Sequence, residues 1–503
     1  MKVAFVNDFS LQIGVQYISS VLKKAGHDVR LFMDPLLFDD DVVSVSFLKR
    51  LFDDKKRILE ELKDYAPDIV GISVVSDFYQ WASEIAALIK KELGVPIIFG
   101  GIHPTSVPEL VIKNDFVDMV CVGEGEYPML ELVESMSRGE IDYGIKNIWF
   151  KKDGRVIRNE LRPLIEDLDS LPLPDKEIFH SESPHYIRDY PYLIVTSRGC
   201  PYRCSYCGHS VTGPLYEGKG RYLRQRSVRN VIGELSESIK KYDIKHVVFL
   251  DDCFGRDRKW LKDFSSEYKK NIALEFICVM HPDDITDETL ACLKTAGCRA
   301  IFLGIQSWNK RIREQILKRE TSNKALETAI KLVQQAGIEI LVDNIFDLPG
   351  QTEKDIIRAA IIYSRLKPTR IYYYMLRYYP NTAITLQAKQ EGRISDKRYS
   401  EVMEGFNVES FALGGDFTDK NSIRFNILFS LIDLMPRRIS RYLIRKKLYR
   451  FFPGRISPAV ILILRNIFSR DLNARLLRRA AFCRYIYFIK KKMFPPKTKV
   501  KVL

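Results

Sequence analysis

Three cysteines with a short, regular spacing are the residues whose types point most directly to chemistry. Cys200, Cys204 and Cys207 lie in the stretch "TSRGCPYRCSYCGHS", directly after the apolar run "YLIVT". Three thiolates are one too many for a disulfide and one short of a closed tetrahedral zinc site. Iron–sulfur cubanes take thiolate ligands, and one short loop can supply three of them. The spacing therefore predicts a cluster whose fourth iron is open to a small chelating ligand.

Two other interpretations of this spacing stay open at this point. His209 could complete a zinc site in the order C-x3-C-x2-C-x-H, or the three thiols could simply be buried. The other six of the nine cysteines are scattered, and an odd total is not typical of a secreted disulfide framework. We therefore expect reduced thiols at Cys121, Cys253, Cys278, Cys292, Cys298 and Cys483.

The elements that must position the cysteine loop begin with an alternating series over residues 1–135. A chain of 503 residues, 46% of them hydrophobic, is long enough for two or three domains. Short apolar runs such as "KVAFVN" and "PIIFGG" alternate with amphipathic helical stretches. This pattern predicts a parallel sheet with helices on both faces, in a doubly wound, flavodoxin-like or Rossmann-like domain. Its ligand would lie at the carboxyl ends of the strands.

A second alternating series follows a segment that contains several prolines. Residues 136–190 show little periodicity, which predicts a linker. Over residues 191–400, six apolar runs from "YLIVT" to "RIYYYML" are separated by helical stretches, which predicts a partial or full α/β barrel. The three cysteines occupy the first loop of this barrel. Residues 401–503 have a helical and strongly basic pattern.

The cysteine loop resembles the radical S-adenosylmethionine superfamily, whose signature is C-x3-C-x2-C with an aromatic residue before the third cysteine. Tyr206 occupies that place, and the resemblance extends over roughly residues 190–400. It implies that Cys200, Cys204 and Cys207 bind a [4Fe-4S] cluster. It also implies that S-adenosylmethionine chelates the open iron through its amino and carboxylate groups. Electron transfer would cleave the sulfonium into methionine and a 5′-deoxyadenosyl radical.

The same resemblance assigns further candidate residues at the strand ends of the barrel. "FLDDCF" ends the second strand where relatives hold the amino group of S-adenosylmethionine, which makes Asp251 and Asp252 candidates. An acidic strand end is equally compatible with a helix N-cap. Gln306 in "GIQS" lies where relatives commonly have Glu and could bind a ribose. "DLPGQT" resembles the fifth-strand loop "GLPGET", with Asp347 for the first Gly and Gln351 for Glu.

The first domain resembles the cobalamin-binding domain that precedes many barrels of this superfamily. The segments that carry the resemblance are "PDIVGISVV", "PIIFGGIHPTSVPE" and "VCVGEGEYP". Glycines at strand ends allow the backbone to approach a bulky ligand, although glycines also end strands in ordinary flavodoxin-like domains. The resemblance implies that cobalamin is contacted by Ser73, Ser76, Gly100, Gly101, Thr105, Gly123 and Gly125.

One expected residue is absent from this domain. Cobalamin domains of the D-x-H-x-x-G type replace the lower cobalt ligand with a histidine. The equivalent stretch, "NDFSLQIG", has Asp8 and Gly14 but no histidine. The resemblance therefore implies cobalamin whose cobalt has no histidine ligand from this loop. His103 lies near the other strand ends, and we interpret it as a hydrogen-bonding residue because that is the commoner role of a lone histidine.

The basic C-terminal region allows three interpretations. Residues 437–503 contain 20 Lys and Arg and one acidic residue, whereas the rest of the chain contains 59 basic and 63 acidic residues. Basic helices with aromatic and aliphatic residues bind anionic membrane surfaces, or pack one face on the protein and expose the other. Nucleic acid is the weakest of the three, because no RNA-binding module accompanies the charges. No uncharged run reaches the roughly 18 residues of a spanning helix.

Taken together, the two resemblances imply a cobalamin-dependent radical S-adenosylmethionine enzyme that methylates an unactivated carbon. Ring closure is an alternative outcome of the same chemistry. Methylthio transfer would need a second cluster, and the first domain has only Cys121. A zinc- or cobalamin-binding module is the non-enzyme alternative. We expect a small-molecule or lipid-like substrate and an electron donor such as flavodoxin or ferredoxin. The N-terminus has no secretion signal, so we expect a cytoplasmic protein, in the membrane interpretation peripheral on the inner membrane face.

Overall fold

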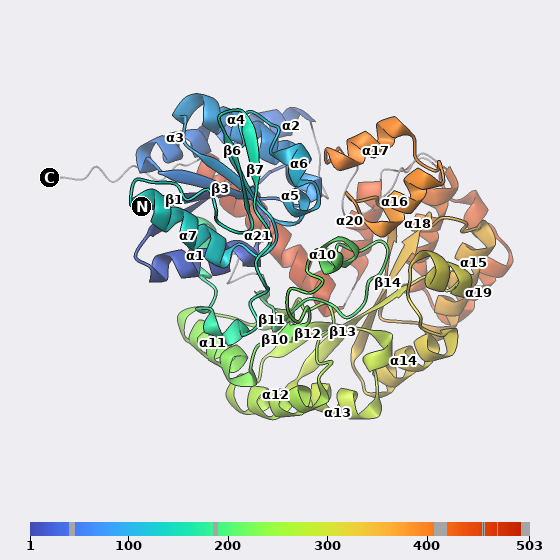
Figure 1. Cartoon of the computed structure of the whole chain (residues 1–503). Helices are drawn as coiled ribbons and strands as arrows, with labels where there is room; N and C mark the ends of the chain where they lie inside the picture. The colour runs from blue at the N-terminus through green and yellow to red at the C-terminus, as the bar shows by residue number, and fades with distance from the viewer. Residues whose placement is uncertain are drawn as a thin grey trace.

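The N-terminal domain is a sheet with helices on both faces (Figure 1). The fold is that of a computed structural model, which describes residues 1–39, 46–184, 190–406, 420–454, 456, 458–469 and 471–493. The strand order is β2-β1-β3-β4-β5-β6-β7, and the first five strands are parallel. The strands are β1 (Lys2–Asn7), β2 (Asp28–Met33), β3 (Ile69–Ser73), β4 (Ile97–Gly100), β5 (Met119–Cys121), β6 (Ile148–Lys152) and β7 (Arg155–Arg158).

Successive residues of each strand point to opposite faces of this sheet, and helices cover both faces. Side chains such as Phe5 and Ile98 pack under α1 and α7, whereas Val6 and Phe99 pack under α3 and α4. The predicted doubly wound domain is therefore confirmed. The helices are α1 (Ile13–Lys24), α2 (Ser46–Leu51), α3 (Lys55–Tyr65), α4 (Tyr79–Leu93), α5 (Ile102–Ser106), α6 (Pro108–Val111) and α7 (Glu126–Ser137).

The predicted linker is partly wrong. Strands β6 and β7, which lie inside the range 136–190, form a hairpin that pairs antiparallel with β5 and extends the first sheet. Their apolar residues alternate over only a few positions, and Phe150 is buried in the core of the first domain. So short an alternation is hard to separate from loop sequence before the sheet that it joins is known. The segment then continues through α8 (Glu177–Glu182) to the barrel.

The second domain is an open, all-parallel sheet of six strands in the order β15-β14-β13-β12-β11-β8, so the predicted partial barrel is confirmed. Its strands are β8 (Tyr192–Ile194), β11 (His246–Phe249), β12 (Glu275–Met280), β13 (Cys298–Gln306), β14 (Glu339–Phe346) and β15 (Arg370–Met375). A small antiparallel pair, β9 (Ser197–Arg198) and β10 (Arg224–Gln225), and the helix α10 (His209–Leu215) lie between β8 and β11 in sequence.

Side-chain caps fix where each outer helix of the barrel begins. The N-cap residues Ser227, Asp257, Thr286, Ser322 and Thr352 each accept a hydrogen bond from a backbone N–H of the first turn. The cap of the helix after "FLDDCF" is thus Asp257, so the N-cap interpretation of Asp251 and Asp252 is wrong. The helices are α11 (Val228–Lys241), α12 (Arg258–Asn271), α13 (Asp287–Ala296), α14 (Asn323–Gln335) and α15 (Glu353–Leu366).

The described part of the C-terminal region is helical, as predicted, whereas residues 407–419 and 494–503 lie outside the described residues. The last helix, α21 (Leu472–Met493), joins both domains (Figure 1, red). Leu472 and Leu476 of α21 pack on the face of the barrel sheet that α11–α15 leave uncovered. At the other end of α21, Phe488 packs against Met33 and Leu37 of the first domain. The packing interpretation of the basic region therefore holds for α21. The helices are α16 (Ala383–Gln390), α17 (Asp396–Met403), α18 (Lys420–Ile432), α19 (Arg437–Arg445), α20 (Pro458–Phe468) and α21 (Leu472–Met493).

Candidate active site between two cofactor domains

The three predicted cluster cysteines lie on the loop that follows β8 and β9, at the carboxyl end of the barrel sheet. Cys204 is 6% exposed, Cys200 and Cys207 are partly exposed, and all three thiols are free. The turn between the last two closes through a hydrogen bond from the Cys207 N–H to the Cys204 carbonyl at 3.0 Å. The donor set and its place at the strand ends thus fit a cluster with three thiolate ligands.

Asp251 anchors the beginning of this loop. Its carboxylate accepts hydrogen bonds from the Thr196 N–H at 3.0 Å, from the Thr196 hydroxyl at 2.7 Å and from the Ser197 hydroxyl at 2.5 Å. These donors stabilise a carboxylate that is only 1% exposed. These contacts indicate that Asp251 positions the cysteine loop. Of the two predicted acidic candidates, only Asp252 has an exposed carboxylate, with 47% of its side chain accessible.

The zinc site completed by His209 is not formed. One ring nitrogen of His209 lies 2.7 Å from the Tyr222 hydroxyl, and the other lies 2.9 Å from the Asp252 carboxylate. Both nitrogens are thus engaged by protein groups. Within the described residues, no three or more His, Cys, Asp and Glu side chains are arranged to hold a single metal ion. A cubane needs a different arrangement, because each thiolate binds its own iron.

Arg319 is a site residue that the sequence analysis missed. Its guanidinium lies 3.5 Å from the Cys204 sulfur and donates to the Gly304 carbonyl at 2.9 Å. The residue is 8% exposed, so its positive charge is held in place beside a sulfur that a cluster requires as a thiolate. The contact joins residues 115 positions apart, and no spacing rule in the sequence indicates it.

The remaining barrel candidates lie at the ends of β13 and β14. Gln306 and Asp347 both have left-handed backbone conformations, with φ of 62° and 59°. Such a φ favours Gly, and Asp is among the residues that tolerate it, which explains how Asp347 replaces the first Gly of "GLPGET". Gln351 accepts a hydrogen bond from the Leu348 N–H at 3.4 Å, so its side chain closes its own turn.

A second unforeseen group is Asp343, on β14. One carboxylate oxygen is buried and has no hydrogen-bond partner. Asp343 is two positions from Leu341, whose side chain lies on the sheet face that packs against α21, so Asp343 belongs to the same face. Burial raises the pKa of Asp343 to about 7, and Arg319 opposes this effect. A carboxyl group of this kind is near its titration point at neutral pH.

Five of the seven candidate cobalamin residues line a cavity of about 280 Å³ at the carboxyl end of the first sheet. Ser73, Gly100, Gly101, Gly123 and Gly125 line it, together with apolar side chains such as Phe5 and Met129. At two lining positions, Gly14 and Gly100, an added Cβ would meet no protein atom closer than 3.7 Å, so these glycines keep free space at the cavity wall. The cavity therefore has room for part of a bulky ligand, next to a largely apolar wall.

Two of the predicted glycines have another role. A Cβ on Gly101 would lie 2.8 Å from the backbone N and O of Val74, and one on Gly123 would lie 1.8 Å from the Tyr216 hydroxyl. Both have positive φ, 95° and 83°. Close approach of protein atoms, rather than of a ligand, is thus what requires glycine at these two positions.

Ser76 and Thr105 contact protein groups instead of lining the cavity. The Ser76 hydroxyl lies 3.0 Å from the His103 ring, and the Thr105 hydroxyl accepts from the Gly123 N–H at 3.0 Å. His103 is fully buried and stacks on Tyr79 with the ring centroids 4.1 Å apart. Burial lowers the pKa of His103 to about 3, so its ring is neutral. These contacts agree with a hydrogen-bonding His103.

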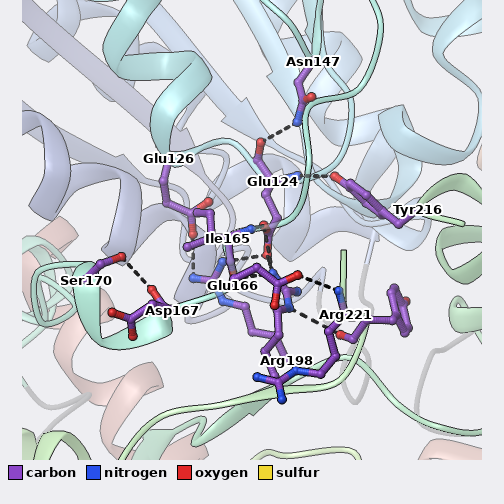
Figure 2. A network of polar contacts seen from close by, with 12 residues as sticks. Glu124, Glu126, Asn147, Ile165, Glu166, Asp167, Ser170, Arg198, Tyr216 and Arg221 are labelled. Atoms are coloured by element: carbon purple, nitrogen blue, oxygen red, sulfur yellow. Dashed lines mark hydrogen bonds and ion pairs between the residues drawn. The ribbon is translucent and has the colours of Figure 1, made fainter. Parts of the chain in front are cut away.

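Residues that follow strands of the two sheets meet in a polar junction, and Figure 2 shows Glu124, Arg198 and Tyr216 within it. Arg198, two positions before Cys200, forms ion pairs with Glu124 at 3.1 Å and with Glu126 at 2.6 Å. Glu124 also pairs with Arg224 at 2.9 Å, and its N–H donates to the Tyr216 hydroxyl at 3.0 Å. Arg198, Glu124 and Glu126 line the cavity of the first domain, so the cavity wall continues into the cysteine loop.

A second set of contacts also joins the two domains. Asp77, after β3, pairs with Arg377, after β15, and accepts a hydrogen bond from the Tyr379 hydroxyl at 3.1 Å. The Asn381 side chain donates to the Ser106 carbonyl at 2.6 Å. Loops after three strands of the first sheet therefore contact the strand-end loops of the barrel. The candidate cobalamin cavity and the candidate cluster loop belong to one site.

Comparisons with known proteins match the N-terminal domain and the barrel to two different family models. The B12 binding domain model matches residues 6–133, and the radical SAM superfamily model matches residues 194–360. An uncharacterized methyltransferase of Pyrococcus horikoshii is 29% identical over 352 residues, which cover 68% of this chain and 71% of that protein. The anaerobic magnesium-protoporphyrin IX monomethyl ester cyclase of Rubrivivax gelatinosus is 27% identical, over 68% of this chain and 60% of the cyclase.

A solved structure extends the likeness to nearly the whole chain. The cobalamin-dependent S-adenosylmethionine radical enzyme OxsB, with aqua-cobalamin and S-adenosylmethionine bound, superposes with a TM-score of 0.66. The alignment covers 97% of this chain and 84% of OxsB at 18% sequence identity. At that identity the likeness concerns the fold, which includes the order and mutual placement of the two domains.

Proposed function

Because the chain belongs to the radical S-adenosylmethionine superfamily and carries an N-terminal B12-binding domain, we propose that it methylates an unactivated carbon of a small-molecule substrate. It is an enzyme, and its cofactors are a [4Fe-4S] cluster, S-adenosylmethionine and cobalamin. When bound, the first two supply a 5′-deoxyadenosyl radical and cobalamin supplies the methyl group. The family assignment does not identify the substrate carbon, and its methylation is part of the proposal.

The observation that carries the proposal is the junction between the two sheets. The cavity lined by Glu124 and Glu126 reaches Arg198, and Arg198 directly precedes the cysteine loop. A substrate between the two carboxyl ends would contact both halves of the site. Hydrogen abstraction and methyl delivery at one carbon require this juxtaposition, because both reacting groups must reach the same atom.

The chain's own residues hold and orient these groups. Cys200, Cys204 and Cys207 would hold the cluster, and Arg319 would balance the negative charge of the Cys204 thiolate. Gly14 and Gly100 keep open the cavity that would receive part of cobalamin. Asp252, Gln306 and Asp347 would contact S-adenosylmethionine from the carboxyl ends of β11, β13 and β14. Packing of the two domains would exclude water and oxygen.

Anaerobic reconstitution tests this assignment of the cysteines. We expect protein treated with iron, sulfide and hydroxocobalamin to contain about four irons and one cobalt per chain. Replacement of Cys204 by Ala should remove the cluster and abolish S-adenosylmethionine cleavage. Cys292→Ala is the matched control, because Cys292 packs at the edge of the barrel core away from the cysteine loop. Zinc in place of iron, or a cluster that survives Cys204→Ala, would contradict the proposal.

The products distinguish methyl transfer from ring closure, the reaction in the name of the Rubrivivax relative. Methylation consumes a second S-adenosylmethionine to restore the methyl donor, so S-adenosylhomocysteine should accumulate together with 5′-deoxyadenosine. Ring closure would produce 5′-deoxyadenosine without S-adenosylhomocysteine. Quantification of both nucleosides in one reaction, with candidate substrates and a chemical reductant, decides between the two outcomes.

We further propose that a flavodoxin or ferredoxin reduces the cluster and that an anionic membrane surface binds α19. Within the described residues, no helix combines the length and apolar composition that crossing a bilayer requires. Yet Ile439, Tyr442 and Phe451 are 53%, 60% and 84% exposed beside the arginines of α19. An exposed apolar face with basic flanks complements anionic lipid headgroups, and it would suit a lipid-like substrate.

Two measurements test these partners. Reduced flavodoxin or ferredoxin should replace the chemical reductant in S-adenosylmethionine cleavage. The full chain should co-sediment with phosphatidylglycerol vesicles and not with phosphatidylcholine vesicles, and Tyr442→Asp should abolish the binding. Leu386→Asp, which changes an exposed residue of α16, is the control that should still bind. Equal binding to both lipids, or full binding by Tyr442→Asp, would contradict the membrane proposal.

A further inference from the structure

A fourth thiol lies at the predicted cluster loop. The Cys253 sulfur is 4.0 Å from the Cys200 sulfur, although the two residues are 53 positions apart. Cys253 belongs to the loop after β11, and β11 pairs in parallel with β8, whose loop carries the three cluster cysteines. Cys253 is 8% exposed. The site therefore brings together four cysteines, while the spacing C-x3-C-x2-C accounts for three.

Contacts of the residues before and after Cys253 hold it in place. Asp251, two residues earlier, is bound by Thr196 and Ser197 at the start of the cysteine loop. Phe254, the next residue, is fully buried, and its N–H donates to the Val279 carbonyl at 2.9 Å. A thiol held between two such anchors is pre-organised toward its neighbour and loses little conformational entropy when it binds.

A second thiol pair in the same domain has a different setting. The sulfurs of Cys278 and Cys298 are 3.9 Å apart, and both residues belong to the hydrophobic core beneath the outer helices. Cys253, by contrast, lies at the strand ends beside Asp252, which binds His209 of the cysteine loop. The Cys278 and Cys298 pair is thus a packing feature of the barrel wall, whereas Cys253 shares the polar mouth of the barrel with the candidate ligands.

We propose that the Cys253 thiolate binds the open iron of the cluster when S-adenosylmethionine is absent and leaves that iron when S-adenosylmethionine binds. This inference rests on the proposed function, because it requires the cluster on Cys200, Cys204 and Cys207. Thiolate is the ligand that iron–sulfur clusters take, and Cys253 is the thiol already in contact with one cluster ligand. Cys253 would protect the open iron until S-adenosylmethionine binds.

The exchange balances in protons and changes no oxidation state. The Cys253 thiol loses a proton when it binds iron, because a metal ligand must be deprotonated. When S-adenosylmethionine displaces it, the iron–sulfur bond to Cys253 breaks and the thiolate takes up one proton. The α-ammonium group of S-adenosylmethionine loses one proton when its nitrogen binds the iron. One proton is therefore released and one is taken up.

Cys253→Ala and Cys253→Ser, reconstituted in the full chain, test the proposal. Both variants should keep about four irons per chain, because the three cluster cysteines are unchanged. The electron paramagnetic resonance spectrum of the reduced cluster should differ from wild type without S-adenosylmethionine and become the same with it. If Cys253 occupies the iron in nine tenths of the wild-type molecules, the variants should bind S-adenosylmethionine about tenfold more tightly.

Cys298→Ala is the matched control, since it removes a thiol with the same sulfur–sulfur separation from the barrel core. Its spectrum and its affinity for S-adenosylmethionine, measured by equilibrium dialysis, should equal those of wild type. Identical spectra of wild type and both Cys253 variants without S-adenosylmethionine would overturn the proposal. Loss of iron in the Cys253 variants would overturn it too, because Cys253 would then be a permanent ligand. Wild-type protein without a four-iron cluster would instead refute the proposed function.

Discussion

The Arg198 guanidinium lies 3.1 Å from the Glu124 carboxylate and thereby connects the wall of the N-terminal cavity to the loop that carries Cys200. Glu124 follows the last parallel strand of the first sheet, and Arg198 follows the first strand of the barrel. Their side chains are 15% and 20% exposed, so solvent screens the pair only weakly. This contact is one of several that hold the two domains in their relative placement, together with the ion pair between Asp77 and Arg377.

Removal of the Arg198 charge should separate radical formation from product formation. In Arg198→Met, Glu126 loses its ion pair while 4% exposed, and we expect a loss of about 2 kcal/mol in the free energy of unfolding. 5′-Deoxyadenosine should still form, but the yield of methylated product per deoxyadenosine should fall. Arg162→Met, which breaks a more exposed pair with Glu131, should change stability by less than about 0.5 kcal/mol. An unchanged product ratio in Arg198→Met would contradict a positioning role.

A methyl group on Gly123 should disturb the domain junction more than the same change at a glycine with free surroundings. Gly123 and Gly139 have φ of 83° and 86°, so Ala at either position strains the backbone by about 1 kcal/mol. At Gly139 an added Cβ meets no atom within 4 Å, whereas at Gly123 it overlaps the Tyr216 hydroxyl. Gly123→Ala should therefore lose clearly more stability in thermal unfolding than Gly139→Ala. Tyr216 is itself 5% exposed, so Tyr216→Ala is destabilising by its own loss of packing. Gly123→Ala should nevertheless cost less stability in a Tyr216→Ala background than in the wild type, and an equal cost in both would refute the overlap as the cause.

The buried His103 should make the first domain sensitive to acid. Its pKa is lowered to about 3 by burial, while in the unfolded chain it is near the usual value of about 6.5. The unfolded state thus binds more protons between these values, and stability falls as the pH decreases from about 6.5. Denaturant unfolding at pH 5 should give a free energy about 2 kcal/mol lower than at pH 7 from this residue alone. His103→Phe, which keeps a ring against Tyr79, should have a smaller pH slope, and an equal slope would contradict the assignment.

Asp343 should have the opposite pH dependence. Burial raises its pKa to about 7, above the unfolded value of about 3.9, so its ionisation destabilises the fold as the pH rises through that interval. Asp343→Asn should therefore be more stable than wild type at pH 8, by about 4 kcal/mol, and equal to it near pH 4. Thermal melts of both proteins at the two pH values measure this difference. A variant that is less stable at pH 8 would indicate that the Asp343 carboxylate has a favourable partner.

Local sequence was sufficient to predict the elements and to name three candidate cluster ligands. The alternation of apolar strands and amphipathic helices depends on residues a few positions apart, and it predicted both parallel sheets with their order along the chain. The spacing of Cys200, Cys204 and Cys207 lies within one loop, so no distant contact was needed to recognise it. The short hairpin of β6 and β7 was missed, because its few alternating residues can be recognised as strands only once they are seen to pair with β5 at the edge of the first sheet.

Tertiary structure alone decided which distant groups share the site. Three side-chain pairs of the site join residues more than 50 positions apart in sequence. They are Arg319 with Cys204, Cys253 with Cys200, and Glu124 with Arg198. Tertiary structure also assigned Asp251 and Thr105 to holding loops, although their residue types fitted ligand contacts equally well. The physical reason is that hydrophobic periodicity specifies which face of an element is buried, but not which other element covers that face. Polar partners are fixed only when the sheets have packed and their strand ends have been brought together.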